Sequence, residues 1–235
     1  DRVVLVTDGR YVAQAEQQIA ASGAGVDEVE MATTVVEQRK RVDALCSGPG
    51  RVGFESTVGT HAEWSAHRDS DELVPIDSVV TGLRRRKDAA EIARITEAAR
   101  IASVALASSR IEAGVTERDI RDELEAAMRA HGADGPSYET IVASGPENAA
   151  MAHHRPTSRM LVEGDTVVID VGALLDGYHS DMTRTFIVGQ PSEEQERWYR
   201  VLARAQQAGL DAVRAGAGTR DVDAACREVL AEEGL

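Results

Sequence analysis

Hydrophobic positions at the front of the chain fall into short apolar runs separated by segments with helical periodicity. Residues 3–6 have the pattern of a strand, and the Asp8-Gly9 pair that follows is typical of a β-hairpin turn. A helical pattern then runs from about residue 10 to residue 21, and residues 51–54 form another short strand candidate. The front of the chain is therefore predicted to be a mixed α/β region.

Helical periodicity becomes stronger further along the chain. Two predicted helices begin with the residue pairs of a capping box, Asp88 with Glu91 and Thr116 with Asp119. Apolar residues then recur three and four positions apart in both segments, as on one face of a helix. The Gly135-Pro136 pair is typical of a turn and is expected to close the second helical segment.

Strand patterns follow these two helices. The pattern predicts a strand over Thr140–Ala143, a polar loop through Arg159, and an apolar strand over Thr166–Val171. The Asp176-Gly177 pair is a hairpin signal, and a second strand is expected over Ser180–Val188.

The order of elements then starts again. Ser192 and Gln195 are expected to cap a third long helix, and Thr219 begins a fourth. Two helices, strands and two more helices suggest a duplicated unit, although the halves share no detectable residue identity. Because the chain opens at Asp1 inside a strand pattern and stops after a helix, we expect the sequence to be incomplete.

The predicted hairpin brings two carboxylates together. If Asp176-Gly177 is a two-residue turn, Asp170 lies opposite Thr183, and Asp170 and Asp181 are diagonal neighbours on one face of the strand pair. Two like charges at this separation are unfavourable unless one takes a proton or a cation lies between them. Oxygen donors suit Mn²⁺ or Mg²⁺. The alternative is that these aspartates only cap a turn or lie exposed at a sheet edge.

The net charge of the chain argues against two classes of binding function. The chain has 26 basic and 40 acidic residues, a net charge of −14, which argues against binding to nucleic acid or to anionic membranes. It contains no apolar run long enough to span a membrane. Its two cysteines cannot form a disulfide framework and suit a reducing cytoplasm, where we expect the protein to be located.

The loop before the hairpin adds a second, more specific pattern. Residues 144–148 (Ser-Gly-Pro-Glu-Asn), 151–157 (Met-Ala-His-His-Arg-Pro-Thr) and 163–165 (Glu-Gly-Asp) precede the Asp170 and Asp181 motifs. Together they resemble the pita-bread metallopeptidases, in particular the branch of Xaa-Pro aminopeptidases and prolidases. The resemblance implies an α+β pita-bread (creatinase/aminopeptidase) catalytic domain over residues 84–235, truncated at its C-terminal end. It also implies a partial creatinase-like α/β N-terminal domain over residues 1–83.

The resemblance also implies roles for individual residues. Asp170 corresponds to an aspartate that binds one metal ion, and Asp181 to one that bridges two ions. His153 corresponds to a catalytic histidine that acts when the tetrahedral intermediate breaks down. His154 and Tyr178 are expected to contact substrate. The family's remaining ligands, a histidine and two glutamates, would lie beyond the end of this chain, so we expect the printed chain alone to be inactive.

The activity implied by the resemblance is hydrolysis of the bond between an N-terminal residue and a following proline. The expected cofactors are two divalent ions, Mn²⁺ first and Co²⁺, Zn²⁺ or Mg²⁺ as alternatives, and the expected assembly is a homodimer. One alternative is a prolidase that takes only dipeptides or a creatinase-like amidinohydrolase. The other is a metal-free pita-bread module for peptide binding or scaffolding, against which the presence of both Asp170 and Asp181 argues.

Overall fold

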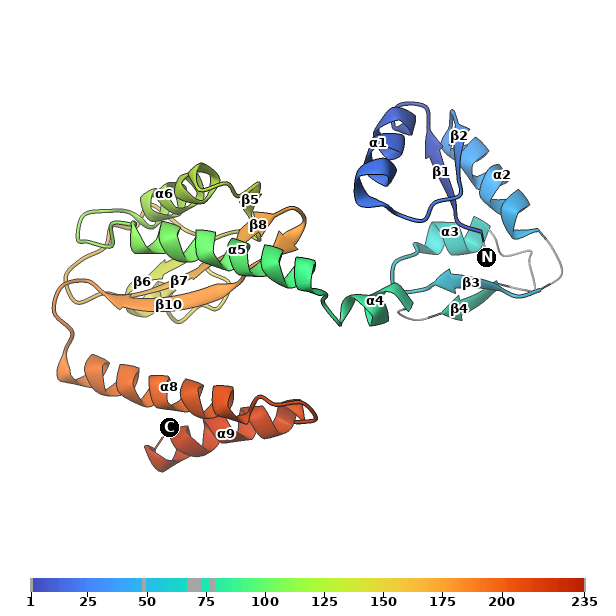
Figure 1. Ribbon diagram of the computed structural model, residues 1–235. Helices are drawn as coiled ribbons and strands as arrows, with labels where there is room; N and C mark the ends of the chain where they lie inside the picture. Colours follow the sequence, from blue (N-terminus) through green and yellow to red (C-terminus); the bar gives the residue numbers. More distant parts are fainter. Residues whose placement is uncertain (1, 48–49, 67–72, 77–78, 235) are drawn as a thin grey trace. The chain divides into compact units, whose positions relative to one another are not determined.

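The computed structural model describes residues 2–47, 50–66, 73–76 and 79–234 of the chain (Figure 1). The chain divides into two compact units, Asp1–Arg86 and Lys87–Leu235. The domain boundary expected after residue 83 stays a prediction.

The first unit alternates strands and helices. Its elements, in chain order, are β1 (Val4–Asp8), α1 (Val12–Ser22), β2 (Glu28–Ala32), α2 (Val35–Cys46), β3 (Val52–Glu55), α3 (His61–Ala66), β4 (Leu73–Ile76) and α4 (Val79–Arg84). β1 pairs with β2 and β3 pairs with β4, both in parallel. Parallel neighbours need a crossover connection, which α1 provides between β1 and β2. The mixed α/β prediction for this region is confirmed.

The hairpin predicted at Asp8-Gly9 is wrong. The chain turns there into α1, and β1 finds its partner in β2 after the helix. The Asp8 carboxylate accepts hydrogen bonds from the backbone N–H of Arg10 at 2.8 Å and from its guanidinium, also at 2.8 Å. An aspartate that closes a local turn in this way serves a strand-to-helix connection as well as a hairpin.

The second unit contains the longer helices and the antiparallel strands. Its elements are α5 (Ala89–Ala107), α6 (Glu117–Ala130), β5 (Gly135–Pro136), β6 (Ile141–Ser144), α7 (Gly145–Asn148), β7 (Thr166–Val171), β8 (Ala173–Leu175), β9 (Tyr178–His179), β10 (Met182–Ile187), α8 (Glu193–Ala212) and α9 (Thr219–Glu232). The strands form two three-stranded sheets, in the orders β10-β7-β6 and β5-β8-β9.

Capping boxes fix the starts of three helices in this unit, as the sequence predicts. They are Asp88 with Glu91 for α5, Thr116 with Asp119 for α6, and Ser192 with Gln195 for α8. In each pair the two side chains satisfy backbone N–H groups that the helix itself leaves without partners.

The core of the second unit lies where α5 and α6 pack against the strands (Figure 1). β7 alternates strictly, so that Val167, Ile169 and Val171 are fully buried against this core. From the helices, Ile101, Ile120 and other apolar residues complete the same cluster. The intervening residues of β7, Asp170 among them, face the other side of the sheet.

The turn predicted at Gly135-Pro136 is wrong. These two residues form the short strand β5, which pairs antiparallel with β8. β5 lies at the edge of its sheet, where one side of the strand has no neighbouring strand. Proline is tolerated there because its missing N–H costs no hydrogen bond between strands on that side. The segment predicted as a polar loop also contains one short helix, α7.

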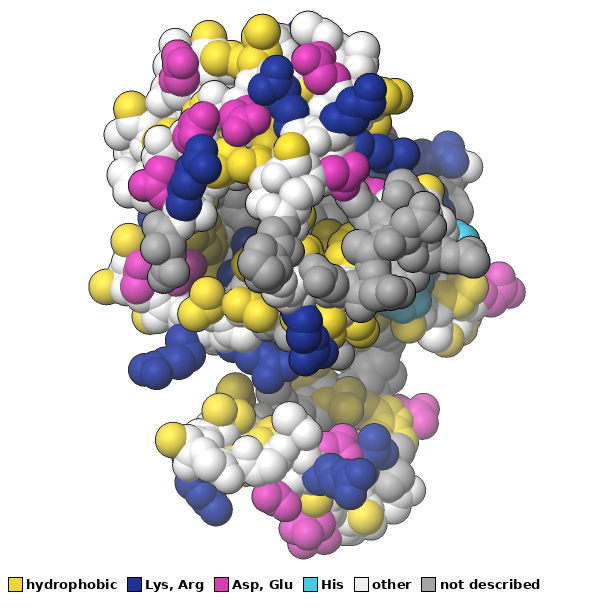
Figure 2. All heavy atoms as spheres, turned by 90° about the vertical axis from the view of Figure 1, so that its right-hand side faces the viewer, with side chains coloured by type: hydrophobic (Ala, Val, Ile, Leu, Met, Phe, Trp, Pro, Cys, Tyr) yellow, Lys and Arg dark blue, Asp and Glu magenta, His cyan; other side chains and the backbone are white. Residues whose placement is uncertain are grey.

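The last two helices pack against each other (Figure 1). A Cβ atom at Gly209 of α8 would lie only 2.4 Å from the sulfur of Cys226 in α9, so the missing side chain allows the close approach of the two helices. None of the described helices is both long and apolar enough to cross a membrane. On the face shown in Figure 2, acidic and basic side chains are interspersed with exposed hydrophobic ones.

Candidate metal centre and the histidine loop

The hairpin has the predicted register both next to its turn, where β8 pairs with β9, and further away, where β7 pairs with β10. Leu175 pairs with Tyr178 across the Asp176-Gly177 turn, and Asp170 pairs with Thr183. Asp176 and Gly177 both have positive φ, 49° and 79°, which a tight hairpin turn of this kind requires. The turn therefore sets the register that carries both aspartates.

Asp170 and Asp181 lie close together, as predicted, and both contact the same tyrosine. The hydroxyl of Tyr138 lies 2.7 Å from Asp170 Oδ1 and 2.9 Å from Asp181 Oδ1. Thr183 donates a further hydrogen bond to Asp170 Oδ1 at 3.1 Å. The two carboxylates thus approach each other closely enough for one hydroxyl to contact both.

This arrangement leaves negative charge that the contacting groups do not balance. A phenol has one hydrogen, so Tyr138 donates to only one of the two carboxylates at a time. Burial and the hydrogen bonds to Asp170 and Asp181 raise the pKa of Tyr138 above its ordinary value, because all of them disfavour the phenolate. The tyrosine therefore remains a neutral donor, and either a proton on one carboxylate or a nearby cation would offset the repulsion within the pair.

A cavity of about 420 Å³ opens beside the carboxylate pair. Its walls are formed by Tyr138, Glu139, Ile141, His153, His154, Arg155, Asp170 and Asp181. Of the predicted site residues, the structure brings His153, His154, Asp170 and Asp181 together here. Tyr178 is not among the lining residues, and its hydroxyl donates instead to Glu91 Oε1 at 3.1 Å.

A larger cavity, of about 580 Å³, lies between β10 and α8. Its described lining is formed mainly by threonine, glutamine and apolar side chains and includes no aspartate, glutamate or histidine. The cavity beside Asp170 and Asp181 is therefore the better candidate for chemistry.

The two neighbouring histidines have different environments. His153 is exposed and lines the cavity. His154 is only 8% exposed, and its Nε2 lies 2.9 Å from Oε2 of Glu117, which is completely buried. We assign the hydrogen to Nε2, since an ionised carboxylate only accepts. The ring of His154 is therefore engaged by the protein on the side away from the cavity.

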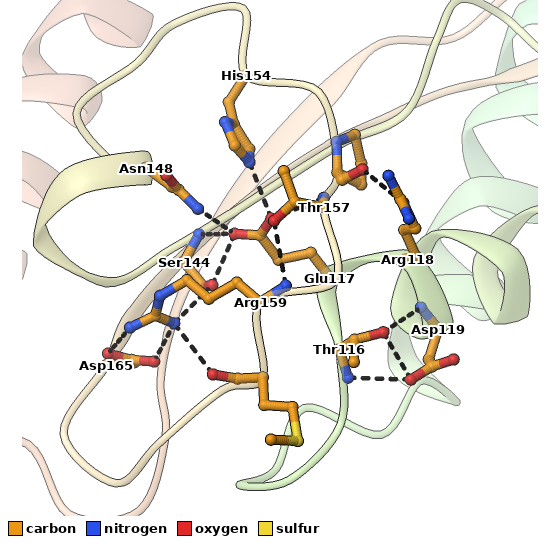
Figure 3. Close-up of polar contacts among 12 residues, drawn as sticks. Thr116, Glu117, Arg118, Asp119, Ser144, Asn148, His154, Thr157, Arg159 and Asp165 are labelled. Carbon is orange, nitrogen blue, oxygen red and sulfur yellow. Dashed lines mark hydrogen bonds and ion pairs between the residues drawn. The ribbon is translucent and has the colours of Figure 1, made fainter.

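Glu117 lies at the centre of a hydrogen-bonded cluster drawn in Figure 3. Its carboxylate accepts hydrogen bonds from the side chains or backbone of Ser144, Asn148, His154 and Thr157. Burial by itself would raise the pKa of Glu117, but these hydrogen bonds outweigh it and lower the pKa to about 2. Glu117 is therefore a buried carboxylate that the protein keeps ionised.

An ion pair extends this cluster. Arg159 donates to Asp165 Oδ2 at 2.6 Å and to the hydroxyl of Ser144 at 2.9 Å (Figure 3). The hydrogen bond from Arg159 lowers the pKa of Asp165 below its ordinary value. Gly145 makes room for the arginine: its φ is 72°, and a Cβ atom there would lie 2.4 Å from Arg159 Nη2. The positive φ favours a glycine at this position.

The roles of Glu117 and Tyr138 could not be predicted from the sequence. Glu117 is the first residue of α6, where acidic residues are common because they interact favourably with the helix dipole. Tyr138 stands alone before β6, and no spacing relates it to the two aspartates. The roles of both residues depend on three-dimensional contacts with residues distant in the sequence.

The side chains of Asp170 and Asp181 are of the chemical type that binds a divalent cation. Both present oxygen atoms, the ligands preferred by Mn²⁺ and Mg²⁺, at a point where negative charge is in excess. Within residues 2–47, 50–66, 73–76 and 79–234, however, no group of three or more acidic, histidine or cysteine side chains is arranged to hold a metal ion. The described residues therefore form no complete metal site, and a role for Asp170 and Asp181 as ligands stays a prediction.

The loop of residues 151–157, here called the histidine loop, lies beside the paired carboxylates of the sheet and the helices that cover it. This is the arrangement of a pita-bread domain of the metallopeptidase type. The profile of Metallopeptidase family M24 matches residues 93–235, and the chain belongs to this family.

Known relatives extend the similarity to the first unit. The chain is 35% identical over 240 residues to the uncharacterized peptidase YqhT of Bacillus subtilis, covering all of this chain and 66% of that protein. The structure matches an Xaa-Pro dipeptidase from Bacillus anthracis with a TM-score of 0.87 and 36% identity, covering 97% of this chain and 64% of that one. It matches an X-Pro aminopeptidase from Thermotoga maritima with a TM-score of 0.83 and 31% identity, covering 98% and 64%. The chain thus spans slightly less than two thirds of the length of these relatives.

Proposed function

We propose that this chain is part of a metal-dependent peptidase that hydrolyses the bond between an N-terminal residue and a following proline. The observation that carries the proposal is the contact of Asp170 and Asp181 with the same Tyr138 hydroxyl, at the wall of a cavity that also contains His153. Membership of family M24 supports a metallopeptidase, and the names of the matched structures support Xaa-Pro substrates.

Asp170 and Asp181 are the residues proposed to hold divalent metal, with Asp181 shared by two ions. Once bound, such ions would supply a water molecule of lowered pKa for attack on the scissile carbonyl. The carboxylates contribute charge and orientation, and the Tyr138 hydroxyl holds one of their oxygen atoms in place.

His153 is the proposed catalytic histidine. It is exposed on the wall shared with the two aspartates, where it can exchange a proton with a peptide bound in the cavity. The substrate contacts expected of His154 and Tyr178 remain predictions. Of these two, only His154 lies at the cavity.

The names of the two matched structures favour different substrate lengths. One is an Xaa-Pro dipeptidase and the other an X-Pro aminopeptidase, which leaves the dipeptidase as a second candidate beside the aminopeptidase. The two differ in whether the carboxylate of proline is free in the substrate. A cationic side chain, Arg155, lines the cavity and lies 3.2 Å from Glu139.

The proposal is tested by assaying the full-length protein, loaded with Mn²⁺, on Ala-Pro, Ala-Pro-Ala and Ala-Ala-Ala. Release of alanine from the two proline peptides and not from Ala-Ala-Ala is the expected result. Preference for Ala-Pro-Ala supports the aminopeptidase, and activity confined to Ala-Pro supports the dipeptidase. A protein that purifies without stoichiometric divalent metal and cleaves none of them would instead be a metal-free binding module.

A further inference from the structure

We propose that Glu117 is a positioning residue, which fixes the loop carrying His153 at the wall of the carboxylate cavity by holding the neighbouring His154. The effect on catalysis rests on the proposed function, whereas the effect on the loop does not. Glu117 itself is fully buried and does not line the cavity, so it acts only through other residues.

The two oxygen atoms of Glu117 hold different segments of the chain (Figure 3). Oε1 accepts from the N–H of Ser144 at 2.9 Å, its hydroxyl at 2.7 Å, and the amide of Asn148 at 2.9 Å, which fixes the end of β6 and α7. Oε2 accepts from His154 Nε2 at 2.9 Å, and from the N–H and hydroxyl of Thr157 at 2.9 and 2.8 Å. One carboxylate thus joins the strand before the loop to the loop itself.

The loop has one anchored and one exposed histidine next to each other. His154 is held by Glu117 on the inner side, and its backbone N–H also donates to the carbonyl of Met151 at 3.3 Å. His153, one peptide bond away, is exposed and lines the cavity with Asp170 and Asp181. Because adjacent backbone atoms cannot move independently, fixing the ring of His154 restricts where the ring of His153 can lie.

The chemistry of the cluster requires a carboxylate. Every group around Glu117 donates a hydrogen bond, and a carboxylate has two oxygen atoms that only accept. A glutamine would turn an NH₂ group toward three of these donors, and an aspartate would be too short to reach both segments. We therefore expect Glu117→Gln to loosen the loop while the hairpin of β7 and β10 stays in place.

Hydrogen–deuterium exchange on the full-length protein tests the loop directly and needs no activity. In Glu117→Gln we expect amides of residues 151–157 to exchange at least about 10-fold faster than in wild type, with the β7 and β10 amides unchanged. Glu125→Gln is the matched control, since Glu125 lies on the same helix, is partly exposed and is 3.7 Å from Arg129. Unchanged exchange over residues 151–157 in a folded Glu117→Gln protein would overturn the proposal.

Steady-state kinetics with Ala-Pro then test the link to His153. We expect Glu117→Gln to lower kcat about 10-fold or more, with KM and Mn²⁺ affinity within about 3-fold of wild type, and to alter the pH profile of kcat. His154→Asn should have a similar effect, and the double variant should be no worse than either single one, because the two residues act as a unit. Independent, multiplying effects of the two substitutions would show that Glu117 does not act through His154.

A milder variant keeps the test valid if Glu117→Gln fails to fold. Thr157→Val keeps the backbone hydrogen bond to Oε2 and removes the hydroxyl, which donates to Oε2 and accepts from the backbone N–H of Arg159 at 3.1 Å. It should show the same localised increase in exchange, smaller in size, and a decrease in kcat of a few-fold. If wild type cleaves no Xaa-Pro peptide but the exchange results hold, the proposed peptidase function fails and the role of Glu117 in ordering the loop stands.

Discussion

Two acidic sites adjoin the loop of residues 151–157, and the contacts around their carboxylates differ in kind. Glu117 is fully buried and accepts hydrogen bonds at both oxygen atoms from four different residues. Asp170 and Asp181 face an open cavity and share one tyrosine hydroxyl. The first is a single charge with an excess of donors, and the second is a pair of charges with a shortage of them.

The difference separates a structural charge from one available for binding. Burying an ionised carboxylate is costly unless hydrogen bonds replace its hydration, and the cluster around Glu117 does this completely enough to lower its pKa to about 2. The described contacts of Asp170 and Asp181 are hydrogen bonds from two neutral hydroxyls, which is why we propose that this pair binds a cation.

The largest effect is expected from Asp170→Asn or Asp181→Asn. Each substitution removes one charge of the pair and should lower both Mn²⁺ affinity and kcat/KM for Ala-Pro by more than about 100-fold, since even residues that only orient ligands contribute 10- to 100-fold. Calorimetric titration with Mn²⁺ and steady-state kinetics measure the two quantities. Asp176→Asn, at the exposed turn of the same hairpin, makes the same chemical change outside the cavity and should leave both near wild type. Wild-type metal affinity in both cavity variants would contradict the assignment.

The next largest effect is on stability, at Glu117. Its folded-state pKa of about 2 lies below the ordinary value of 4.5, so the unfolded state binds the proton first as the pH falls. The resulting stabilisation, about 3 kcal/mol, is fully present above pH 4.5 and is lost as the pH falls from 4.5 to about 2.

Urea unfolding of wild type and Glu117→Gln, followed from pH 7 to pH 2, measures this contribution. The difference in free energy of unfolding should shrink by about 3 kcal/mol over the acidic part of the range. Comparing the two proteins cancels the other carboxylates, which titrate in both. A difference that is independent of pH would mean that Glu117 is not ionised in the folded protein.

The contrast also shows what the sequence could predict. Asp170 and Asp181 are separated by eleven positions and a two-residue turn, so strand alternation alone places them on one face, and the predicted register is observed. Capping boxes such as Thr116 with Asp119 are equally local. The family resemblance added the roles of these residues, which spacing alone does not give.

Contacts across long stretches of sequence were not predictable in this way. The partners of Glu117 lie 27 to 40 positions away, and two of them donate through backbone N–H groups that have no sequence signature. The same reason explains the two wrong turns. Turn-forming residues occur at Asp8-Gly9 and Gly135-Pro136. However, β1 pairs with β2 and β5 pairs with β8, which are strands further along the chain.

A smaller effect is expected from Tyr138→Phe, which removes the hydroxyl shared by the aspartates. Its hydrogen bond orients one carboxylate, so its loss should weaken Mn²⁺ binding about 10-fold, the lower end of the effect of residues behind metal ligands. Tyr178→Phe is the matched control, because its hydroxyl donates to Glu91 and it does not line the cavity. The control should change Mn²⁺ affinity less than about 2-fold, and a substantially raised KM for Ala-Pro would support the substrate contact predicted for Tyr178. Equal metal affinities in wild type and Tyr138→Phe would show that the shared hydroxyl has no part in the centre.

The smallest effect is expected at Arg155, the residue directly after His154. Arg155 pairs with Glu139 at 3.2 Å, but the two side chains are 81% and 55% exposed, against 6% and 0% for His154 and Glu117. Ion pairs in water contribute little because hydration competes with them, so Arg155→Gln should change the free energy of unfolding by less than about 0.5 kcal/mol. Urea unfolding at low and high salt, with Glu139→Gln completing a double-mutant cycle, measures the pair. A coupling above about 1 kcal/mol would mean that the exposed pair also helps to hold the loop; a value near zero leaves that role to the buried carboxylate one residue away.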